Sequence, residues 1–476
     1  MKSPILGASY LARTVNAAAD RCVNLYPETV PQGGKEPGFL SRAPGLKFLK
    51  TVGNGPIRGL IEFSENAYII SGHEMYKMDL ALNVTFLGNV TGTGPVSLAD
   101  NGNQVFVACN PDGFIYNSTT GVFQQITDPD FAGAMRVGYV DGYFAFNEPN
   151  SRRWWITSLL DGTAIDPLDF ASVEGDPNNL VALFIDHREV WLFSDDATEI
   201  WYNAGTAEFP FQRIQGAFIE TGCAAPFSIA KLDNSIFWLG MDERGNGIVY
   251  RANGYTPVKV STHALEFAIQ AYSTVEDAVG YSYQQEGNLF YVLSFPSGNN
   301  TWVFDVTTGL WHERADFSNG SFSRHRSNCQ MNFANQIMVG DYENGNIYAL
   351  DMYTFADNGQ PQKWLRSWRA LPTGQNNLSR TSHHALQLDC ESGTGLITGQ
   401  GSDPQVLLRW SDDGGHNWSN YHARPMGKIG EFGRRVIWRR LGMTTKIRDR
   451  VYEVSGTDPV KLAIMGAELL ITPTFS

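Results

Sequence analysis

Short apolar runs separated by polar turns recur along the chain from about residue 56 to residue 352. Each unit has a first run of four or five apolar or aromatic residues, a polar turn, and a second short aromatic run. Runs of this length bounded by turn residues are typical of β-strands, so we expect neighbouring runs to pair as local antiparallel strands. Seven first runs begin near Ala67, Asn103, Gly142, Arg188, Asn234, Asn288 and Asn335.

The mean spacing of these runs is about 45 residues, which is the period of four-stranded propeller blades. The individual spacings vary from 36 to 54 residues, so the pattern predicts a six- or seven-bladed β-propeller and leaves the blade count open. Two units, 116–123 and 304–311, are nearly superposable, because both contain an Asx-x-Thr-Thr-Gly turn between strands. The longest spacing contains a helical pattern over 263–272, which we expect to be inserted between blades.

The two ends of the chain have a different texture from the middle. Residues 1–52 are interrupted by prolines and a Gly-Gly pair, so we expect an extended N-terminal arm that lies along another domain or a neighbouring subunit. Residues 53–355 form the expected propeller. Residues 356–476 begin with polar loops and then alternate as strands, which predicts a small antiparallel β domain. The predicted fold class is therefore all-β.

One turn motif in the C-terminal part has a clear physical meaning. Ser411, Asp413, Gly415 and Trp418 fit the pattern Ser-x-Asp-x-Gly-x-x-Trp, the Asp box. Short polar side chains in such a turn bond to their own backbone, and Gly tolerates a positive φ. We therefore interpret the box as a structural hairpin and not as a catalytic site.

The charge of the chain is uneven. The formal net charge is −13, which argues against nucleic-acid binding over the whole surface. Between Arg424 and Arg450, nine basic residues stand against two acidic ones, a local charge of +7 that leaves −20 for the remainder. Such a run is either a solvated face or a docking surface for an acidic neighbour. The candidate interface residues are Arg434, Arg435, Trp438, Arg439 and Arg440.

No motif predicts a metal site, a cofactor or a membrane segment. The five cysteines are scattered without a Cys-x-x-Cys pair, and His325 and Cys329 have ligand-like spacing but no second pair. His383 and His384 are adjacent on a predicted strand, so their side chains point to opposite faces. Scattered cysteines of this kind favour a protein folded in a reducing cytoplasm. No 18-residue apolar run or signal-peptide core is present, so we expect a soluble protein.

The enzyme alternative is a propeller-fold tail glycosidase of the sialidase type. That family combines several Asp boxes with an early Phe/Tyr-Arg-Ile-Pro motif and a tyrosine nucleophile. Here there is one box, and the nearest match to the arginine motif, residues 211–215, is interrupted and has no proline. The sequence therefore favours a protein without catalytic activity, since the fold alone implies no chemistry.

Five segments at the two ends of the chain share a pattern with a known family. They are Cys22–Glu28, Arg42–Leu46, Arg409–Trp418, Gly430–Gly442 and Asp458–Val460. In these segments the chain resembles the packaged-DNA stabilisation proteins of short-tailed bacteriophages, which are tail nozzle or head-completion proteins. The segments cover less than a quarter of the chain, and the middle matches by architecture only.

The resemblance implies a structural virion protein that is assembled in the host cytoplasm and resides in the tail. It implies a hexameric ring docked below the portal and its adaptor, with a tail needle, fibre or tailspike below it. The ring would retain packaged DNA and later let the genome pass. The arm and the basic residues are then expected at contacts between subunits or with the adaptor.

Overall fold

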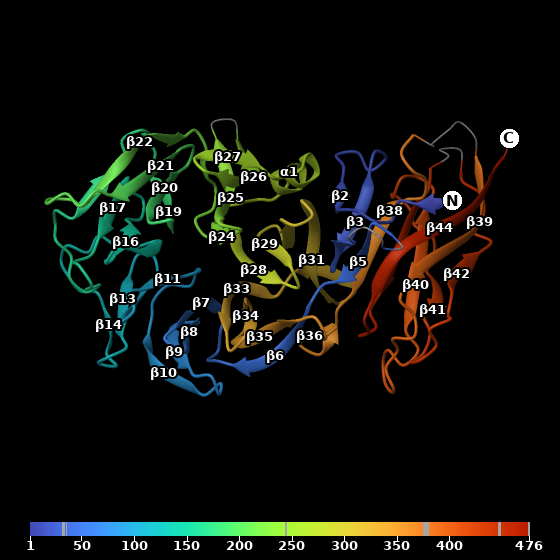
Figure 1. Ribbon diagram of the computed structural model, residues 1–476, viewed down its shortest axis with the longest axis horizontal. Helices are drawn as coiled ribbons and strands as arrows, with labels where there is room; N and C mark the ends of the chain where they lie inside the picture. Colours follow the sequence, from blue (N-terminus) through green and yellow to red (C-terminus); the bar gives the residue numbers. More distant parts are fainter. Residues whose placement is uncertain (31–33, 35, 243–244, 375–379, 446–448, 475–476) are drawn as a thin grey trace.

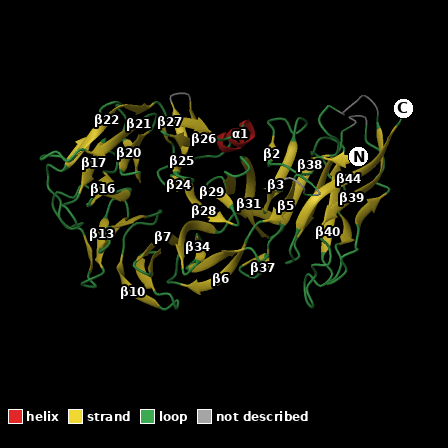
Figure 2. Cartoon of the chain, in the orientation of Figure 1, coloured by secondary structure: helices red, strands yellow, loops and turns green. Residues whose placement is uncertain are grey.

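The computed structural model describes residues 1–30, 34, 36–242, 245–374, 380–445 and 449–474. Within these residues the chain is built from strands with one helix, which confirms the all-β class. A ring of sheets occupies one half of the molecule and a two-layered β domain the other half (Figures 1 and 2).

Seven sheets, counted over the described residues, form the ring, so the propeller has seven blades. Neighbouring strands within each blade pair antiparallel along the chain, as the local pairing of apolar runs predicts. The blades comprise β7 (Ile57–Phe63), β8 (Asn66–Ser71), β9 (Glu74–Met78) and β10 (Val84–Asn89); β11 (Ser97–Asp100), β12 (Gln104–Ala108), β13 (Gly113–Asn117) and β14 (Phe123–Gln125); β15 (Val137–Val140), β16 (Tyr143–Asn147), β17 (Arg153–Ile156) and β18 (Phe170–Ser172); β19 (Leu180–Asp186), β20 (Glu189–Ser194), β21 (Thr198–Asn203) and β22 (Phe211–Ile219); β23 (Gly222–Cys223), β24 (Ala230–Leu232), β25 (Ser235–Asp242), β26 (Gly245–Asn253) and β27 (Thr256–Lys259); β28 (Val279–Gln285), β29 (Asn288–Phe295), β30 (Asn300–Asp305), β31 (Leu310–Ser318) and β32 (Ser321–Arg324); and β33 (Ser327–Phe333), β34 (Gln336–Asp341) and β35 (Asn346–Asp351).

Each blade packs on the next through an apolar cluster of its own. The second strand of a blade is buried on both faces, which explains why β12 and β16 are continuous apolar runs without alternation. The outer strand β10 is only partly buried. The clusters between successive blades therefore hold the ring together as one body.

The two superposable turns have the same hydrogen bonds. The side-chain Oδ1 of Asn117 accepts from the backbone N–H groups of Thr119 and Thr120, each at 3.0 Å. In the other turn, Asp305 Oδ1 accepts from the N–H of Thr307 at 2.9 Å. The glycine that ends each turn has a φ near +70°, a conformation that costs little without a Cβ.

The last blade is closed by a strand from the beginning of the chain. β6 (Gly45–Thr51) pairs antiparallel with β35 and forms the fourth strand of that blade. The propeller strands thus include residues 45–51, which we had expected to lie in the arm. The sequence pattern could not indicate this, because β6 is exposed at several positions and pairs with a strand far away in the sequence.

The rest of the N-terminal segment is also strand, and most of its pairing is with the C-terminal domain. β1 (Lys2–Ser3) pairs with β44 (Ala463–Pro473), and β4 (Leu25–Thr29) and β5 (Gly38–Arg42) extend the same sheet. β2 (Tyr10–Leu11) pairs with β3 (Ala19–Val23), which lies between β31 of the sixth blade and β38 (Trp364–Arg369). The segment therefore lies along another domain of its own chain, and its burial needs no neighbouring subunit.

Two side chains of the N-terminal segment tie the propeller to the C-terminal domain. Asn24 exchanges hydrogen bonds with the backbone of Ala315 and donates to the carbonyl of Lys363 at 2.8 Å. The buried guanidinium of Arg42 donates to five carbonyl oxygens, among them those of Asp458 at 2.6 Å and Val460 at 2.9 Å. Three of the five family-like segments thus meet at this junction.

The C-terminal domain is a sandwich of two sheets around one apolar core. One sheet has the order β4-β5-β44-β39-β42, and the other continues from β3 through β38, β43 and β40 to β41. Between the sheets lie buried residues such as Trp368, Trp438 and Tyr452. The remaining strands are β36 (Ala356–Asp357) and β37 (Gln360–Pro361) beside the last blade, and β39 (Thr381–Cys390), β40 (Gln405–Ser411), β41 (His422–Pro425), β42 (Val436–Arg439) and β43 (Val451–Gly456) in the sandwich.

The helix predicted over 263–272 is confirmed as α1 (His263–Gln270). It lies between β27 of the fifth blade and β28 of the sixth. Thr262 caps its first turn, because the hydroxyl of this residue accepts from the N–H of Leu265. The helix buries Leu265 and Ile269 against the two blades and leaves Phe267 exposed.

Candidate docking surfaces

The Asp box forms a turn whose hydrogen bonds are internal. Ser411 Oγ donates to Asp413 Oδ1 at 2.7 Å and accepts from the N–H of Gly415 at 2.8 Å. Asp413 Oδ1 also accepts from the N–H groups of His416 at 3.0 Å and Asn417 at 2.8 Å. The bond from the Asn417 backbone and the other donors hold the pKa of Asp413 well below its usual range. The carboxylate is thus engaged with its own turn.

Trp418, the last residue of the box, lies against the end of β40. The guanidinium of Arg409 stacks over its ring at 4.7 Å from the centroid. The same guanidinium forms a bidentate pair with Glu453, with distances of 2.6 and 2.9 Å. The structure therefore brings all four residues of the box together beside the ion pair between Arg409 and Glu453, in which both charged groups already have a partner.

Four of the five candidate interface residues lie exposed on β42 or beside it. We call Arg434, Arg435, Arg439 and Arg440 the basic edge, because β42 is the outer strand of its sheet. Arg435 donates from Nε and Nη2 to the side-chain oxygen of Gln387 on β39. The structure thus concentrates four positive charges along one edge of the sandwich.

The fifth candidate, Trp438, does not lie on the surface of the chain, so the prediction that it is an interface residue is wrong. Its side chain is only 1% exposed and belongs to the core between the two sheets. Its indole N–H donates to the carbonyl of His422 at 2.7 Å. Because side chains alternate along β42, the arginine that follows Trp438 points outward while the indole points into the core.

The wider run of basic residues divides into exposed and buried members. Arg424 and Lys428 are exposed like the basic edge. Arg450 is buried, and its Nε and Nη2 donate to the carboxylate of Asp412 at 2.6 and 2.8 Å. Lys446 and Arg448 lie outside the described residues. Counting charge along the sequence therefore overstates the positive surface.

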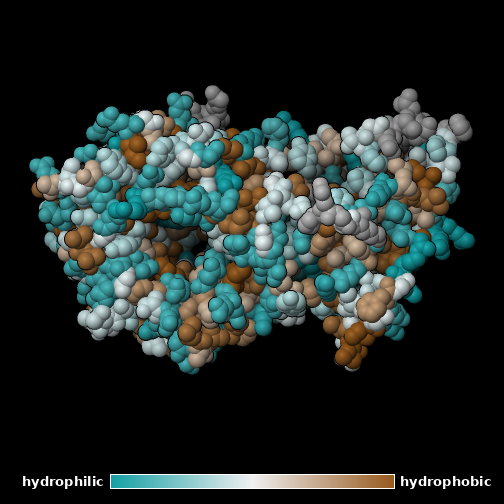
Figure 3. Space-filling view, in the orientation of Figure 1, coloured by the Kyte–Doolittle hydropathy of each residue, from teal (hydrophilic) through white to brown (hydrophobic). Residues whose placement is uncertain are grey.

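The loops beside the basic edge present an exposed apolar cluster that the sequence analysis missed. We call Ile397, Ile429 and Phe432 the apolar tip; their exposed fractions are 82%, 59% and 76%. They lie on the loops β39–β40 and β41–β42, and the hydrophobic colour gathers on this end of the sandwich in Figure 3. No periodicity could have revealed these residues, because Ile429 and Phe432 are single apolar residues among glycines and charges, and Ile397 follows only Leu396 in a loop of glycines and polar residues.

The loops of the apolar tip are held to each other by hydrogen bonds. The N–H of Gly430 donates to the carbonyl of Gly393 at 3.1 Å. Ser392 Oγ donates to the carbonyl of Phe432 at 2.8 Å. The apolar side chains therefore project from bonded loops. Exposed apolar clusters of this kind commonly mark contact surfaces.

The propeller has a cavity of about 650 Å³ near its axis, where loops from all seven blades meet. We call it the axial cavity; the middle of the propeller is visibly hollowed in Figure 3. Its lining includes three carboxylates, Asp195, Glu276 and Asp277. Burial raises the pKa of Asp195, and the neighbouring Asp176 and Glu276 add to the effect. The apolar part of its lining includes Met135, Leu180, Val181, Phe227, Met241 and Val275.

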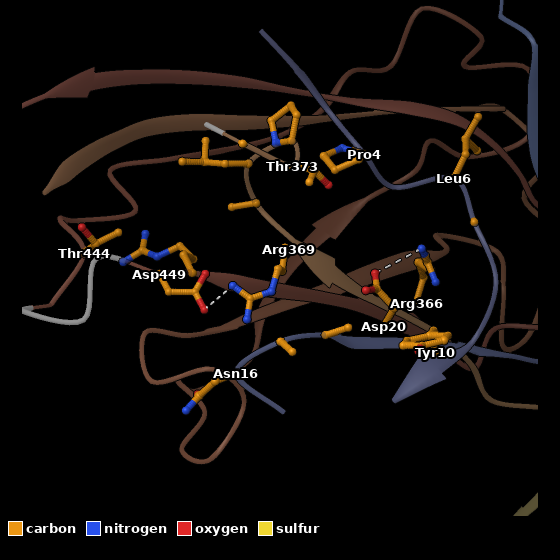
Figure 4. Close-up of a pocket in the computed structure, with 18 of the residues that line it drawn as sticks. Pro4, Leu6, Tyr10, Asn16, Asp20, Arg366, Arg369, Thr373, Thr444 and Asp449 are labelled. Carbon is orange, nitrogen blue, oxygen red and sulfur yellow. Dashed lines mark hydrogen bonds and ion pairs between the residues drawn. The ribbon is translucent and has the colours of Figure 1, made fainter. Parts of the chain in front are cut away.

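A second cavity, of about 510 Å³, lies between the N-terminal segment and β38 (Figure 4). Its charged groups are engaged with each other: Arg369 pairs with Asp449 at 2.6 Å, and Arg366 lies 3.5 Å from Asp20. Arg366 also donates from Nε to the carbonyl of Ile5 at 2.6 Å. These contacts anchor the N-terminal segment on the sandwich, and they give this cavity a structural role.

The candidate metal and catalytic groups do not form a reactive cluster. His383 is buried, bonded to Tyr452 and Thr381, and its pKa is lowered to about 3 by burial, whereas His384 is exposed on the other face of β39. Within the described ranges, no three His, Cys, Asp or Glu side chains are placed to hold a metal ion. In the same part of the chain, no helix is long and apolar enough to cross a membrane.

A seven-bladed propeller joined through shared strands to a β-sandwich places the chain among two-domain, all-β propeller proteins. Residues 1–355 match the family described as Bacteriophage P22 Gp10, beta-propeller, and residues 363–472 match Bacteriophage P22 Gp10, beta-sandwich. The chain therefore belongs to the P22 Gp10 family of phage stabilisation proteins, which are structural proteins of the virion. This confirms the family resemblance noted in the sequence.

Comparison with solved structures returns chains of low sequence identity to this one. PorZ of Porphyromonas gingivalis is 12% identical, with a TM-score of 0.41 over 79% of this chain and 46% of that chain. BamB from Moraxella catarrhalis is 10% identical, with a TM-score of 0.40 over 69% of this chain and 97% of that chain. No curated protein sequence matches the chain.

Proposed function

We propose that the chain is the tail nozzle of a short-tailed phage. Six copies form a ring that docks below the portal and its adaptor, closes the exit after packaging, and later forms part of the conduit for the genome. A tail needle, fibre or tailspike binds below it. The observation that carries this proposal is the match of both domains, in order, to the phage stabilisation family.

The physical properties of the chain support a ring subunit. The propeller and the sandwich share strands, so the subunit is a rigid wedge and not two tethered domains. The basic edge and the apolar tip offer contact surfaces at one end, and rings form when one surface of a subunit binds a different surface of the next. The net charge of −13 also favours a conduit that does not retain DNA by adhesion.

Deletion of the protein from its phage tests the proposal. Heads made without it should package DNA and then lose it, and the chain supplied in trans should restore DNA retention. Electron microscopy of complemented particles should place a six-fold ring directly below the adaptor. Particles that retain DNA without the protein, or that carry it elsewhere in the virion, would refute the proposal.

We also infer that the chain is not an enzyme. Asp413 is bonded within its own turn, and Arg213, the remnant of the arginine motif, pairs with Glu199 at 3.3 Å. Purified protein should not turn over sialosides or host surface polysaccharides. Glycan hydrolysis that is lost on changing Arg213 or a nearby tyrosine would instead support the tail glycosidase.

A further inference from the structure

The apolar tip and the axial cavity are complementary in shape and in charge. The tip is a protruding apolar cluster flanked by basic residues, and the cavity has an apolar lining that includes carboxylates. We propose that the apolar tip of one copy enters the axial cavity of the next copy in the ring. The inference rests on the proposed ring and names the two surfaces that would join its subunits.

The apolar tip is built to be inserted. Ile397, Ile429 and Phe432 are largely exposed, and the hydrogen bonds between their loops limit the entropy that would be lost on binding. Lys428 and Arg434 flank them in the sequence, and both are exposed. Between them, Glu431 accepts a hydrogen bond from the backbone N–H of Lys428 at 3.0 Å, and the two cations against this one carboxylate leave residues 428–434 net positive.

The axial cavity can receive such a group. Its volume of about 650 Å³ lies within the range of binding sites that enclose several side chains. Two arginines also line it, so its three carboxylates leave it with a formal charge of −1. Arg58 donates to the carbonyls of Gly94, Gly72 and Thr91, and Arg324 lies over the ring of Tyr342 at 3.5 Å, so neighbouring residues hold both guanidinium groups. The exposed carboxylate of Glu276 is thus the best partner for a cation from another chain.

The partner is a second copy because the charges complement each other within this chain. The basic edge presents four exposed arginines, whereas residues 53–355 hold 14 basic against 35 acidic residues, so the surface that best attracts the basic edge is the propeller of another copy. A chain cannot fill its own cavity, because the propeller occupies one half of the molecule and the sandwich, which carries the apolar tip, occupies the other (Figure 1).

The same charges decide the symmetry of the contact. A two-fold dimer through the sandwich would set each basic edge and tip against its own copy, with repulsion between like charges. Contact between the tip of one copy and the cavity of another uses one of each per subunit. Such a head-to-tail interface generates a ring when its rotation closes.

Cross-linking in assembled tails tests this placement. The chain with Phe432→Cys and Glu276→Cys is incorporated into virions, tails are isolated, and a short bis-maleimide is added. Neighbouring copies should join through thioether bonds into a ladder up to the size of the ring. Each single-cysteine chain and the unmodified chain, whose five native cysteines are buried or partly buried, serve as background.

A matched control replaces the cavity position with an equally accessible site on the propeller. Leu168 is exposed, and it is absent from the cavity lining, so Phe432→Cys with Leu168→Cys should give no ladder. Tails that contain the Phe432/Glu276 variant but yield only single copies would overturn the inference and leave the nozzle proposal intact. Tails that lack the unmodified protein altogether would refute the nozzle proposal instead.

A charge exchange provides an independent test that does not depend on cysteine chemistry. Arg434→Glu should reduce incorporation of the chain into tails by about threefold to tenfold at low salt, and adding Glu276→Lys should restore it. Both positions are exposed, so the folded chain should keep its thermal unfolding midpoint. Failure of the second change to restore any assembly would count against contact between these residues.

Discussion

Trp438 and Phe432 lie six positions apart at one end of the sandwich, and their side chains have opposite surroundings. Trp438 is 1% exposed between the two sheets and its N–H is bonded, whereas Phe432 is 76% exposed on a loop. Burial of an aromatic ring stabilises the monomer, while an exposed ring contributes to stability only when a partner covers it. The contrast separates residues that fold the subunit from residues that are available to join subunits.

The largest expected effect is on the core side of this contrast. Trp438→Ala should lower the free energy of unfolding by about 3 to 5 kcal/mol, because it leaves a cavity and an unpaired carbonyl at His422. Denaturant unfolding of Trp438→Ala and of the unmodified chain would measure this loss. Phe432→Ala is the matched control and should change the unfolding free energy by less than about 0.5 kcal/mol. Equal losses in both variants would erase the distinction.

A middle-sized effect is expected from the Asp-box turn. Asp413→Ala should cost about 1 to 2 kcal/mol, because the N–H groups of His416 and Asn417 lose their acceptor. Asp403→Ala, at an exposed carboxylate in the β39–β40 loop, should be nearly neutral. If Asp413→Ala were as stable as the unmodified chain and yet failed to assemble into tails, Asp413 would be a contact residue like those of the apolar tip.

The smallest expected effect is a pH dependence of the core. Burial lowers the pKa of His383 to about 3, below the usual 6.5, so its contribution to stability is present above pH 6.5 and is lost as the pH falls. Between pH 6.5 and 5.5 this loss should be about 1 kcal/mol. His383→Gln should flatten the unfolding free energy over that range, whereas His384→Gln, on the exposed face, should not. Identical slopes would contradict the assignment.

Local pattern was sufficient to predict the propeller but not its closure. Runs such as β12 and β16 predict blade strands, because each is an apolar run flanked by turn residues. β6 could not be assigned, since the partner that makes it a blade strand lies 295 residues further along, at Asn346. A period read along the sequence carries no information on such distant pairs.

The candidate interface was predicted only in part, because the sequence run does not show which of its residues face the core. Strand alternation decides which residues of β42 face the core, and the run Arg434 to Arg440 was assigned as a unit without it. The apolar tip depends on two loops that meet in space, at Gly393 and Gly430. Exposed apolar residues in loops are common, so only their convergence distinguishes Ile397 and Phe432 from ordinary surface residues.

The pairing of β6 with β35 has a consequence for synthesis. The first strand of the closing blade leaves the ribosome hundreds of residues before its partner, so the ring stays open for most of translation. The hydrogen bond from Arg42 to the carbonyl of Val460 forms still later in synthesis, because the two residues are 418 positions apart. Contacts of such long range slow folding and make it depend on nearly the whole chain. A chain terminated before β35 therefore has an unsealed ring and no sandwich.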